Sequence, residues 1–170
     1  KYEGVYDDGW EKIRKKRFKR LQDLGIISKQ TQLSEKFPED RDWEKLSRKE
    51  QKKEARLMEV YAAMIDRMDQ NIGRLLEQLK KKGEIDNTVI MFLSDNGAYS
   101  AGNIAWSKYS HSRFDPEAKA GTPESFTGYG KNWATVSNVP FRLFKSKVHE
   151  GGIATPFIAY YPGKFEQGYI

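Results

Sequence analysis

Cysteine is absent from this chain of 170 residues, and histidine occurs only twice. The lack of cysteine excludes disulfides, thiolate metal sites and cysteine nucleophiles within these residues, and it leaves the redox compartment undetermined. No apolar run approaches the roughly 20 residues that a membrane span needs, and no signal-like segment opens the chain. We therefore expect a domain without membrane contact, with any targeting sequence upstream.

The composition is that of a polar but foldable globular protein, with 38% hydrophobic and 32% charged residues. Because the chain starts at Lys1 rather than Met, we expect it to be a piece of a longer protein. The net charge of +6 arises entirely in residues 1–83, which hold 22 Lys and Arg against 16 Asp and Glu. A basic half is compatible with nucleic acid, with a polyanionic substrate or with a solvated helix surface, of which the last is commonest.

Two helices are predicted from apolar spacing in the first half. Asp7-Asp8-Gly9 marks the start of the first, which Gly25 stops, and residues 26–46 are interpreted as a surface connection. Ser47 and Glu50 form a capping box that starts a second helix, expected to run to Gly83 against a core. Its stripe of apolar residues has helical spacing: Met58, Tyr61, Ile65, Met68, Ile72, Leu75, Leu76 and Leu79.

The second half predicts strands. Residues 88–93 form an unbroken apolar run, which is typical of a strand covered on both faces. Residues 98–139 have no lasting period and are expected to be extended and irregular, hence functional rather than idle. Residues 141–148 alternate as a strand would, and residues 153–161 predict another apolar strand. A helix followed by a short turn and a buried strand indicates an α/β sandwich.

Asp95-Asn96-Gly97 follows the first predicted strand, where α/β sheets place their ligands. A carboxylate and an amide oxygen are ligands that Ca²⁺ or Mg²⁺ prefers. Gly97 would permit a sharp exit with positive φ. A plain turn explains the same three residues, so the pair is at most half of a metal site.

A second cluster combines cations with a diglycine turn. On the predicted strand, Lys145 and Lys147 share one face and His149 continues it before Glu150-Gly151-Gly152. A lysine ammonium is a compact charge suited to a phosphate or sulfate oxygen, although lysine also protects exposed strand edges. Glu150 is interpreted as an anchor for the turn.

Taken together, these motifs resemble the sulfatase family, in particular the bacterial arylsulfatase type. The resemblance rests on order and spacing along the chain, and it includes the opening residues 2–7 with Trp10. The motifs that carry it are Glu59 to Asp66, Met68-Asp69, Asn71-Ile72-Gly73, Leu93 to Ala98, His149 to Pro156, and Tyr161-Pro162-Gly163.

The resemblance implies roles for three residues. Asp95 and Asn96 match the pair with which sulfatases hold a calcium ion, and Lys145 matches a lysine that contacts the sulfate of the substrate. It also implies an alkaline-phosphatase-like α/β sandwich with a mixed sheet flanked by helices, here incomplete. The substrate class would be sulfate monoesters, aryl or sugar, and the location periplasmic or secreted.

The family's nucleophile is a formylglycine made from a Cys/Ser-x-Pro-x-Arg signature, which this chain lacks. Its nearest look-alike is Asn138-Val139-Pro140-Phe141-Arg142, whose asparagine cannot become the aldehyde. We therefore interpret residues 1–170 as the C-terminal part of one catalytic domain, with the remainder of that domain as its partner and no activity alone. Its segments are expected to be residues 1–46, 47–97, 98–139 and 140–170.

Two alternatives stay open. A phosphatase- or phosphodiesterase-like relative of the same superfamily usually binds two metal ions through several histidines. This chain has only two histidines, which disfavours that alternative. A non-enzymatic nucleic-acid module would use the basic residues of the first helix, without any recognised nucleic-acid fold pattern. Those residues are Lys12, Arg14, Lys15, Lys16, Arg17, Lys19 and Arg20.

The sequence does not determine which sulfate ester is bound or the roles of His111 and His149. Aromatic residues in the irregular segment would either stack on a sugar or ring of the substrate or serve packing: Trp106, Tyr109, Phe114, Phe126, Tyr129 and Trp133.

Overall fold

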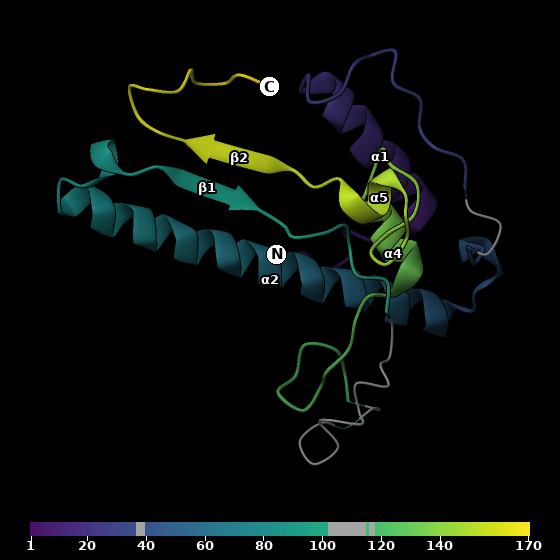
Figure 1. Cartoon of the computed structure of the whole chain (residues 1–170). Helices are drawn as coiled ribbons and strands as arrows, with labels where there is room; N and C mark the ends of the chain where they lie inside the picture. Colours follow the sequence, from purple (N-terminus) through teal and green to yellow (C-terminus); the bar gives the residue numbers. More distant parts are fainter. Residues whose placement is uncertain (37–39, 102–114, 116–117) are drawn as a thin grey trace.

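A computed structural model of the chain describes all residues except 37–39, 102–114 and 116–117, which are drawn in grey in Figure 1. Three of the aromatic residues named above, Trp106, Tyr109 and Phe114, and also His111, lie outside the described residues. Among the described helices, none combines the length and apolar character needed to cross a bilayer.

The first predicted helix is confirmed as α1, Trp10–Asp23. It follows Gly9, whose φ of 79° suits glycine and whose surroundings leave no room for a side chain, because an added Cβ would lie 2.4 Å from the ring of Trp43. At the other end Gly25 adopts φ 72°, and its amide bonds the carbonyl of Gln22. The predicted start and stop of this helix are therefore both correct.

The second predicted helix is confirmed as α2, Arg48–Lys81, the longest element of the chain. Its capping box is present: Ser47 Oγ accepts from the Glu50 amide, and the Glu50 carboxylate accepts from the Ser47 amide at 2.8 Å. The core-facing stripe is only partly correct. Met58 is 4% exposed, whereas Ile65 is 42% and Leu75 is 62% exposed, because the described residues cover only the first turns of this helix.

The hydrophobic core lies where α1 meets the short helix α4, Gly130–Ser137. Its centre is Trp133, fully buried, with the rings of Trp10 and Trp43 edge-on at 6.0 and 6.2 Å between centroids. Two sequence predictions are wrong here. The segment 98–139 contains a buried helix, and the connection 26–46 contains a 3₁₀ turn, η1 (Trp43–Lys45), that contributes Trp43 to the core.

The sheet is smaller than predicted. β1 (Ile90–Leu93) pairs antiparallel with β2 (Phe157–Tyr160), so that Leu93 faces Phe157 and Ile90 faces Tyr160. Both strands were predicted, but the described residues form this antiparallel pair alone rather than a mixed sheet. The expected burial on both faces is also wrong: Met91 is 62% and Ile158 59% exposed, because no other described element covers the strands.

The chain passes from α2 to β1 through η2 (Ile85–Asn87), so that β1 runs back in the direction opposite to α2 (Figure 1). The end of β1 therefore points toward the part of the molecule where α4 and α5 (Glu150–Ile153) lie. This return brings the residues after β1 to the candidate site.

The predicted strand at 141–148 is wrong. This segment is a series of turns that follows the cis peptide Val139-Pro140. Leu143 and Ser146 have φ of 67° and 74°, in the left-handed region, which no regular strand accommodates. The diglycine that was expected to form a turn instead lies within α5.

Candidate functional site

Asp95 and Asn96 leave the end of β1 and lie beside α5. The carboxylate of Asp95 is exposed and has no hydrogen bond or ion pair with any described residue. Asn96 is half-buried, and its Nδ2 donates to the Gly97 carbonyl at 2.9 Å. That hydrogen bond uses the nitrogen of the amide, which leaves Oδ1 as the atom with which Asn96 would bind a cation.

Gly97 is buried against the two glycines of α5. Its amide donates to the Gly152 carbonyl at 3.0 Å, and an added Cβ would lie 1.8 Å from the carbonyl oxygen of Gly151. The positive φ expected at Gly97 is wrong, since its backbone is not among those with positive φ. Glycine is needed here for the close approach of two backbones, and this approach joins the two motifs that the sequence singled out.

Asn138 holds the same junction together from the end of α4. Its Oδ1 accepts from the Ala98 amide at 2.9 Å. Its Nδ2 donates to the carbonyls of Leu143 and Gly151 at 2.8 and 2.7 Å. One side chain therefore ties the segment after β1, the turns after Pro140 and α5 to each other.

Lys145 is brought to the same place through its backbone. Its amide donates to the Ala98 carbonyl at 3.0 Å, three residues after Asp95. The ammonium group lies 5.7 Å from the centroid of the Tyr99 ring, within range of a cation–π interaction. Lys145 forms no ion pair with a described residue, so its charge is not neutralised locally.

The strand that would place the other residues of the second cluster on one face with Lys145 does not form. Lys147 and His149 are exposed, and His149 Nε2 lies 3.4 Å from an Arg142 guanidinium nitrogen. Glu150 is exposed in the first turn of α5. The common face predicted for Lys145, Lys147 and His149 is therefore wrong, because it depended on a strand that does not form.

A pocket of about 470 Å³ lies between α2 and the segment after β1. Its polar wall includes Ser94, Asn96 and Asn138, and its apolar wall includes Val60 and Met64 of α2. Tyr129 and Tyr61 also line it, with ring centroids 4.4 Å apart. Burial and the neighbouring Tyr61 raise the pKa of the Tyr129 phenol, so this hydroxyl stays protonated at neutral pH.

The donor set suits a hard cation but is incomplete. Ca²⁺ takes six to eight oxygen ligands. Asp95 and Asn96 offer such oxygens, yet the described residues contain no group of three or more His, Cys, Asp and Glu side chains placed to hold one ion. Any calcium bound here needs further ligands from other parts of the protein.

The basic face of α1 is largely engaged within the chain. Arg14 is only 4% exposed and donates to the Ser34 side chain at 2.7 Å. Lys16 and Lys19 form ion pairs with Asp8 and Asp23 at 2.7 and 2.9 Å. The surface that a nucleic-acid module would need is therefore less positive than the sequence suggested.

Sequence reasoning missed Asn138 as a positioning residue. In the sequence, Asn138 stands out only because it precedes Val139-Pro140-Phe141-Arg142, which resembles the nucleophile signature. No local pattern predicts its hydrogen bonds to residues 40 positions before and 13 positions after it. A buried Tyr129 was likewise not foreseen, since α4 was interpreted as irregular. Of the remaining aromatic residues, Trp133 serves the core and Phe126 is 52% exposed.

Comparison with known proteins finds one family that matches almost the whole chain. The sequence profile of the family described as Sulfatase matches residues 2–170. The chain is 38% identical to the arylsulfatase of Klebsiella aerogenes over 178 aligned residues, which cover 100% of this chain and 37% of that protein. It is 39% identical to an uncharacterized sulfatase of Schizosaccharomyces pombe over 171 aligned residues, covering 95% of this chain and 30% of that protein.

Over a shorter stretch of 49 residues, or 29% of its length, the chain is 47% identical to an N-acetylglucosamine-6-O-sulfatase of Bacteroides thetaiotaomicron. The chain thus spans about a third of the length of the relatives that it matches throughout.

Proposed function

The chain belongs to the sulfatase family, and on that premise we propose that it is the C-terminal part of the catalytic domain of a sulfuric ester hydrolase. In this proposal Asp95 and Asn96 contribute to a calcium site and Lys145 contacts the sulfate of the substrate. The observation that carries the proposal is the junction described above, where one set of backbone hydrogen bonds joins the segments of all three residues.

Asp95 and Asn96 would hold the calcium ion through the carboxylate and through Oδ1. When bound, the ion would draw electron density from the sulfate oxygens, as metal ions do in ester hydrolysis. The described residues do not complete the set of ligands, and in this proposal the rest of the catalytic domain supplies further ones. The hydrogen bond from the Gly97 amide to the Gly152 carbonyl ties the chain directly after Asp95 and Asn96 to α5.

Lys145 would neutralise a sulfate oxygen whose negative charge grows as the S–O bond to the leaving group breaks. Its ammonium has no carboxylate partner among the described residues, so an incoming anion need not displace one. The ring of Tyr99 under the ammonium limits the directions in which the side chain extends. Both features support the proposed contact between Lys145 and the sulfate.

The nucleophile, a formylglycine, would be supplied by a segment outside these residues. Asn138 cannot take that role, because all its side-chain hydrogen-bonding groups already bind the backbone of neighbouring segments. We accordingly expect the 170-residue polypeptide, purified free of other enzymes, to release no sulfate from an aryl sulfate. Turnover by this polypeptide alone would contradict the proposal that the nucleophile lies outside these residues.

Substrate preference of the complete protein tests the proposed reaction. With para-nitrophenyl sulfate and para-nitrophenyl phosphate at equal concentrations, we expect kcat/KM for the sulfate to exceed that for the phosphate. A preference for the phosphate would favour the phosphatase-like alternative and would contradict the proposal.

A further inference from the structure

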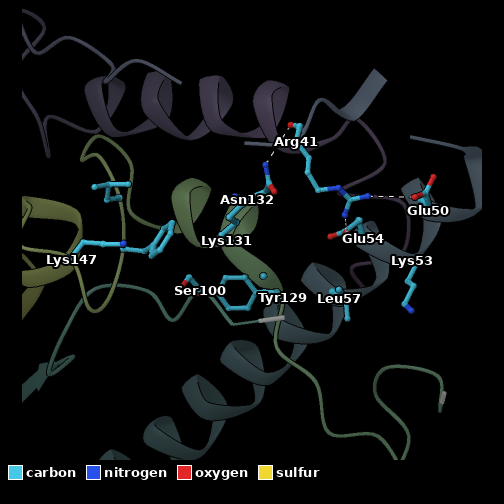
Figure 2. Close-up of a pocket in the computed structure, with 13 residues that line it drawn as sticks. Arg41, Glu50, Lys53, Glu54, Leu57, Ser100, Tyr129, Lys131, Asn132 and Lys147 are labelled. Carbon is cyan, nitrogen blue, oxygen red and sulfur yellow. Dashed lines mark hydrogen bonds and ion pairs between the residues drawn. The ribbon is translucent and has the colours of Figure 1, made fainter. Parts of the chain in front are cut away.

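A second pocket, of about 780 Å³, lies between the start of α2, the start of α4 and the turns after Pro140 (Figure 2). It is enclosed by the start of α2, the start of α4 and the turns at residues 143–147. Ser100, which follows Tyr99, and Lys147, two residues after Lys145, belong to its wall. The pocket therefore lies next to the two chain segments that hold Lys145, the residue proposed to contact the sulfate. We call it the basic pocket.

Four cationic and two anionic side chains line the basic pocket: Arg41, Lys53, Lys131 and Lys147, and Glu50 and Glu54. Both carboxylates are engaged by a single guanidinium, since Arg41 lies 2.8 Å from Glu54 and 3.5 Å from Glu50. Arg41 is therefore a structural residue of the wall. The positive charge that remains for a ligand comes from lysines.

Two of these lysines are available to a ligand. Lys53 and Lys147 are exposed, and the ammonium group of neither forms a hydrogen bond or ion pair with a described residue. Figure 2 shows Lys147 on the side opposite Arg41, Glu54 and Lys53. Cationic groups at both ends suit an extended, negatively charged ligand better than a compact one.

The first turn of α4 adds to the positive character of this wall. Gly130, Lys131 and Asn132 line the pocket, and the N-cap Tyr129 makes no side-chain capping bond. The N-terminal end of a helix dipole favours negative charge at this position. The dipole alone is a small effect, and here it acts in the same direction as the lysines.

From this arrangement we infer that the basic pocket binds a second oxyanion, a sulfate or carboxylate, on the same substrate whose scissile sulfate contacts Lys145. The inference rests on the proposed function and names its substrate class: sulfate esters that carry more than one negative group, such as sulfated oligosaccharides. A simple aryl sulfate would leave the basic pocket empty and would gain nothing from it.

The test compares three substrates with the complete protein: a monosulfated disaccharide, the same disaccharide with a second sulfate, and the same monosulfated disaccharide with a carboxylate instead. In the unsubstituted protein we expect kcat/KM to be higher for at least one of the two doubly charged substrates. The two arms distinguish a sulfate subsite from a carboxylate subsite.

Substitutions then locate the effect. Exposed charge pairs contribute modestly, so Lys53→Gln or Lys147→Gln should each lower the preference for the doubly charged substrate about threefold, and the double variant about tenfold. Turnover of the monosulfated substrate by the same variants verifies that they fold. Lys12→Gln, which removes an exposed lysine of α1 outside the pocket, is the matched control and should keep the preference.

Four results would overturn parts of this account. Equal kcat/KM for all three substrates, or a double variant that keeps the preference, would contradict the subsite and leave the proposed function intact. A loss of preference in Lys12→Gln as large as in the double variant would show a general charge effect and contradict the subsite as well. No turnover of any sulfate by the unsubstituted protein would contradict both.

Discussion

At the scale of single residues, Gly97 and Lys145 contribute to the site in different ways. Gly97 allows two backbones to meet, with its amide 3.0 Å from the Gly152 carbonyl, and Lys145 supplies a positive charge that no carboxylate of a described residue pairs. The first contribution is steric and should appear in the stability of the fold. The second is electrostatic and should appear in the rate of the reaction.

Gly97→Ala should destabilise the protein strongly. The added Cβ would lie 1.8 Å from the Gly151 carbonyl oxygen, so backbone must move, and we expect a loss of at least about 2 kcal/mol in the free energy of unfolding. Urea unfolding of the complete protein measures it. The matched control is Gly73→Ala within α2, where nothing lies within 4 Å and alanine should be neutral or stabilising. Equal stability of the two variants would contradict the close approach.

Lys145→Ala should lower kcat/KM for a sulfate monoester in the complete protein by about 10²-fold, as removal of a group that stabilises developing charge does elsewhere. Lys145→Arg keeps the charge and should recover part of the loss. The kinetics are measured with para-nitrophenyl sulfate. An alanine variant with unchanged kcat/KM would show that Lys145 does not contact the reacting sulfate.

The residues of the site were predictable where a motif exists. Asp95, Asn96 and Lys145 were chosen from the sequence, and the structure joins their segments, although the calcium and sulfate roles stay predictions. Asn138 was not predictable as a positioning residue, because its three hydrogen bonds depend on a tertiary junction and not on neighbouring residues.

At the scale of elements, local signals were accurate for helices and less so for strands. Both long helices were predicted with their ends, because Gly25 and the Ser47–Glu50 box act through local backbone groups. The alternation of residues 141–148 predicted a strand wrongly, since left-handed Leu143 and Ser146 bend the chain toward α5. The short helix α4 was missed, because its burial follows from the tryptophan cluster and not from a period.

The capping box gives a prediction for α2 as an element. In a peptide of residues 44–83, Ser47→Ala should lower far-UV helicity, because replacing a serine N-cap typically costs about 1 kcal/mol. The bonds from Ser47 lower the pKa of Glu50, so its contribution is present at neutral pH and is lost as the pH falls through that pKa. Circular dichroism should therefore show the difference shrink on acidification, and a difference that grows would contradict the reciprocal bonds.

At the scale of the whole molecule, apolar surface is left uncovered over the sheet and the second half of α2. Met64, Met91 and Leu93 are each more than half exposed, and Phe157 is 59% exposed on β2. The sequence predicted Met91 and Leu93 as part of a strand covered on both faces, and we expect the remainder of the proposed catalytic domain to cover them. The overall α/β class was therefore predictable from the pattern, whereas the number and direction of strands were not.

This exposed surface predicts how the isolated chain behaves. The dye ANS, which fluoresces on apolar surface, should bind the 170-residue polypeptide more strongly than it binds the complete protein, in which the remainder of the domain would cover the strands. Fluorescence titration at equal molar concentration measures the difference. Equal dye binding by the two proteins would contradict the prediction that the remainder of the domain covers these strands.

The central claim is that Asp95 and Asn96 bind the calcium ion on which sulfate ester hydrolysis depends. The most direct test is the rate of inorganic sulfate release from para-nitrophenyl sulfate as a function of free Ca²⁺, for the complete protein and for its Asp95→Ala/Asn96→Ala variant. We predict a saturable calcium dependence in the unsubstituted protein, and in the variant a half-saturating concentration at least about tenfold higher or no turnover. Identical calcium curves for the two proteins would contradict the claim.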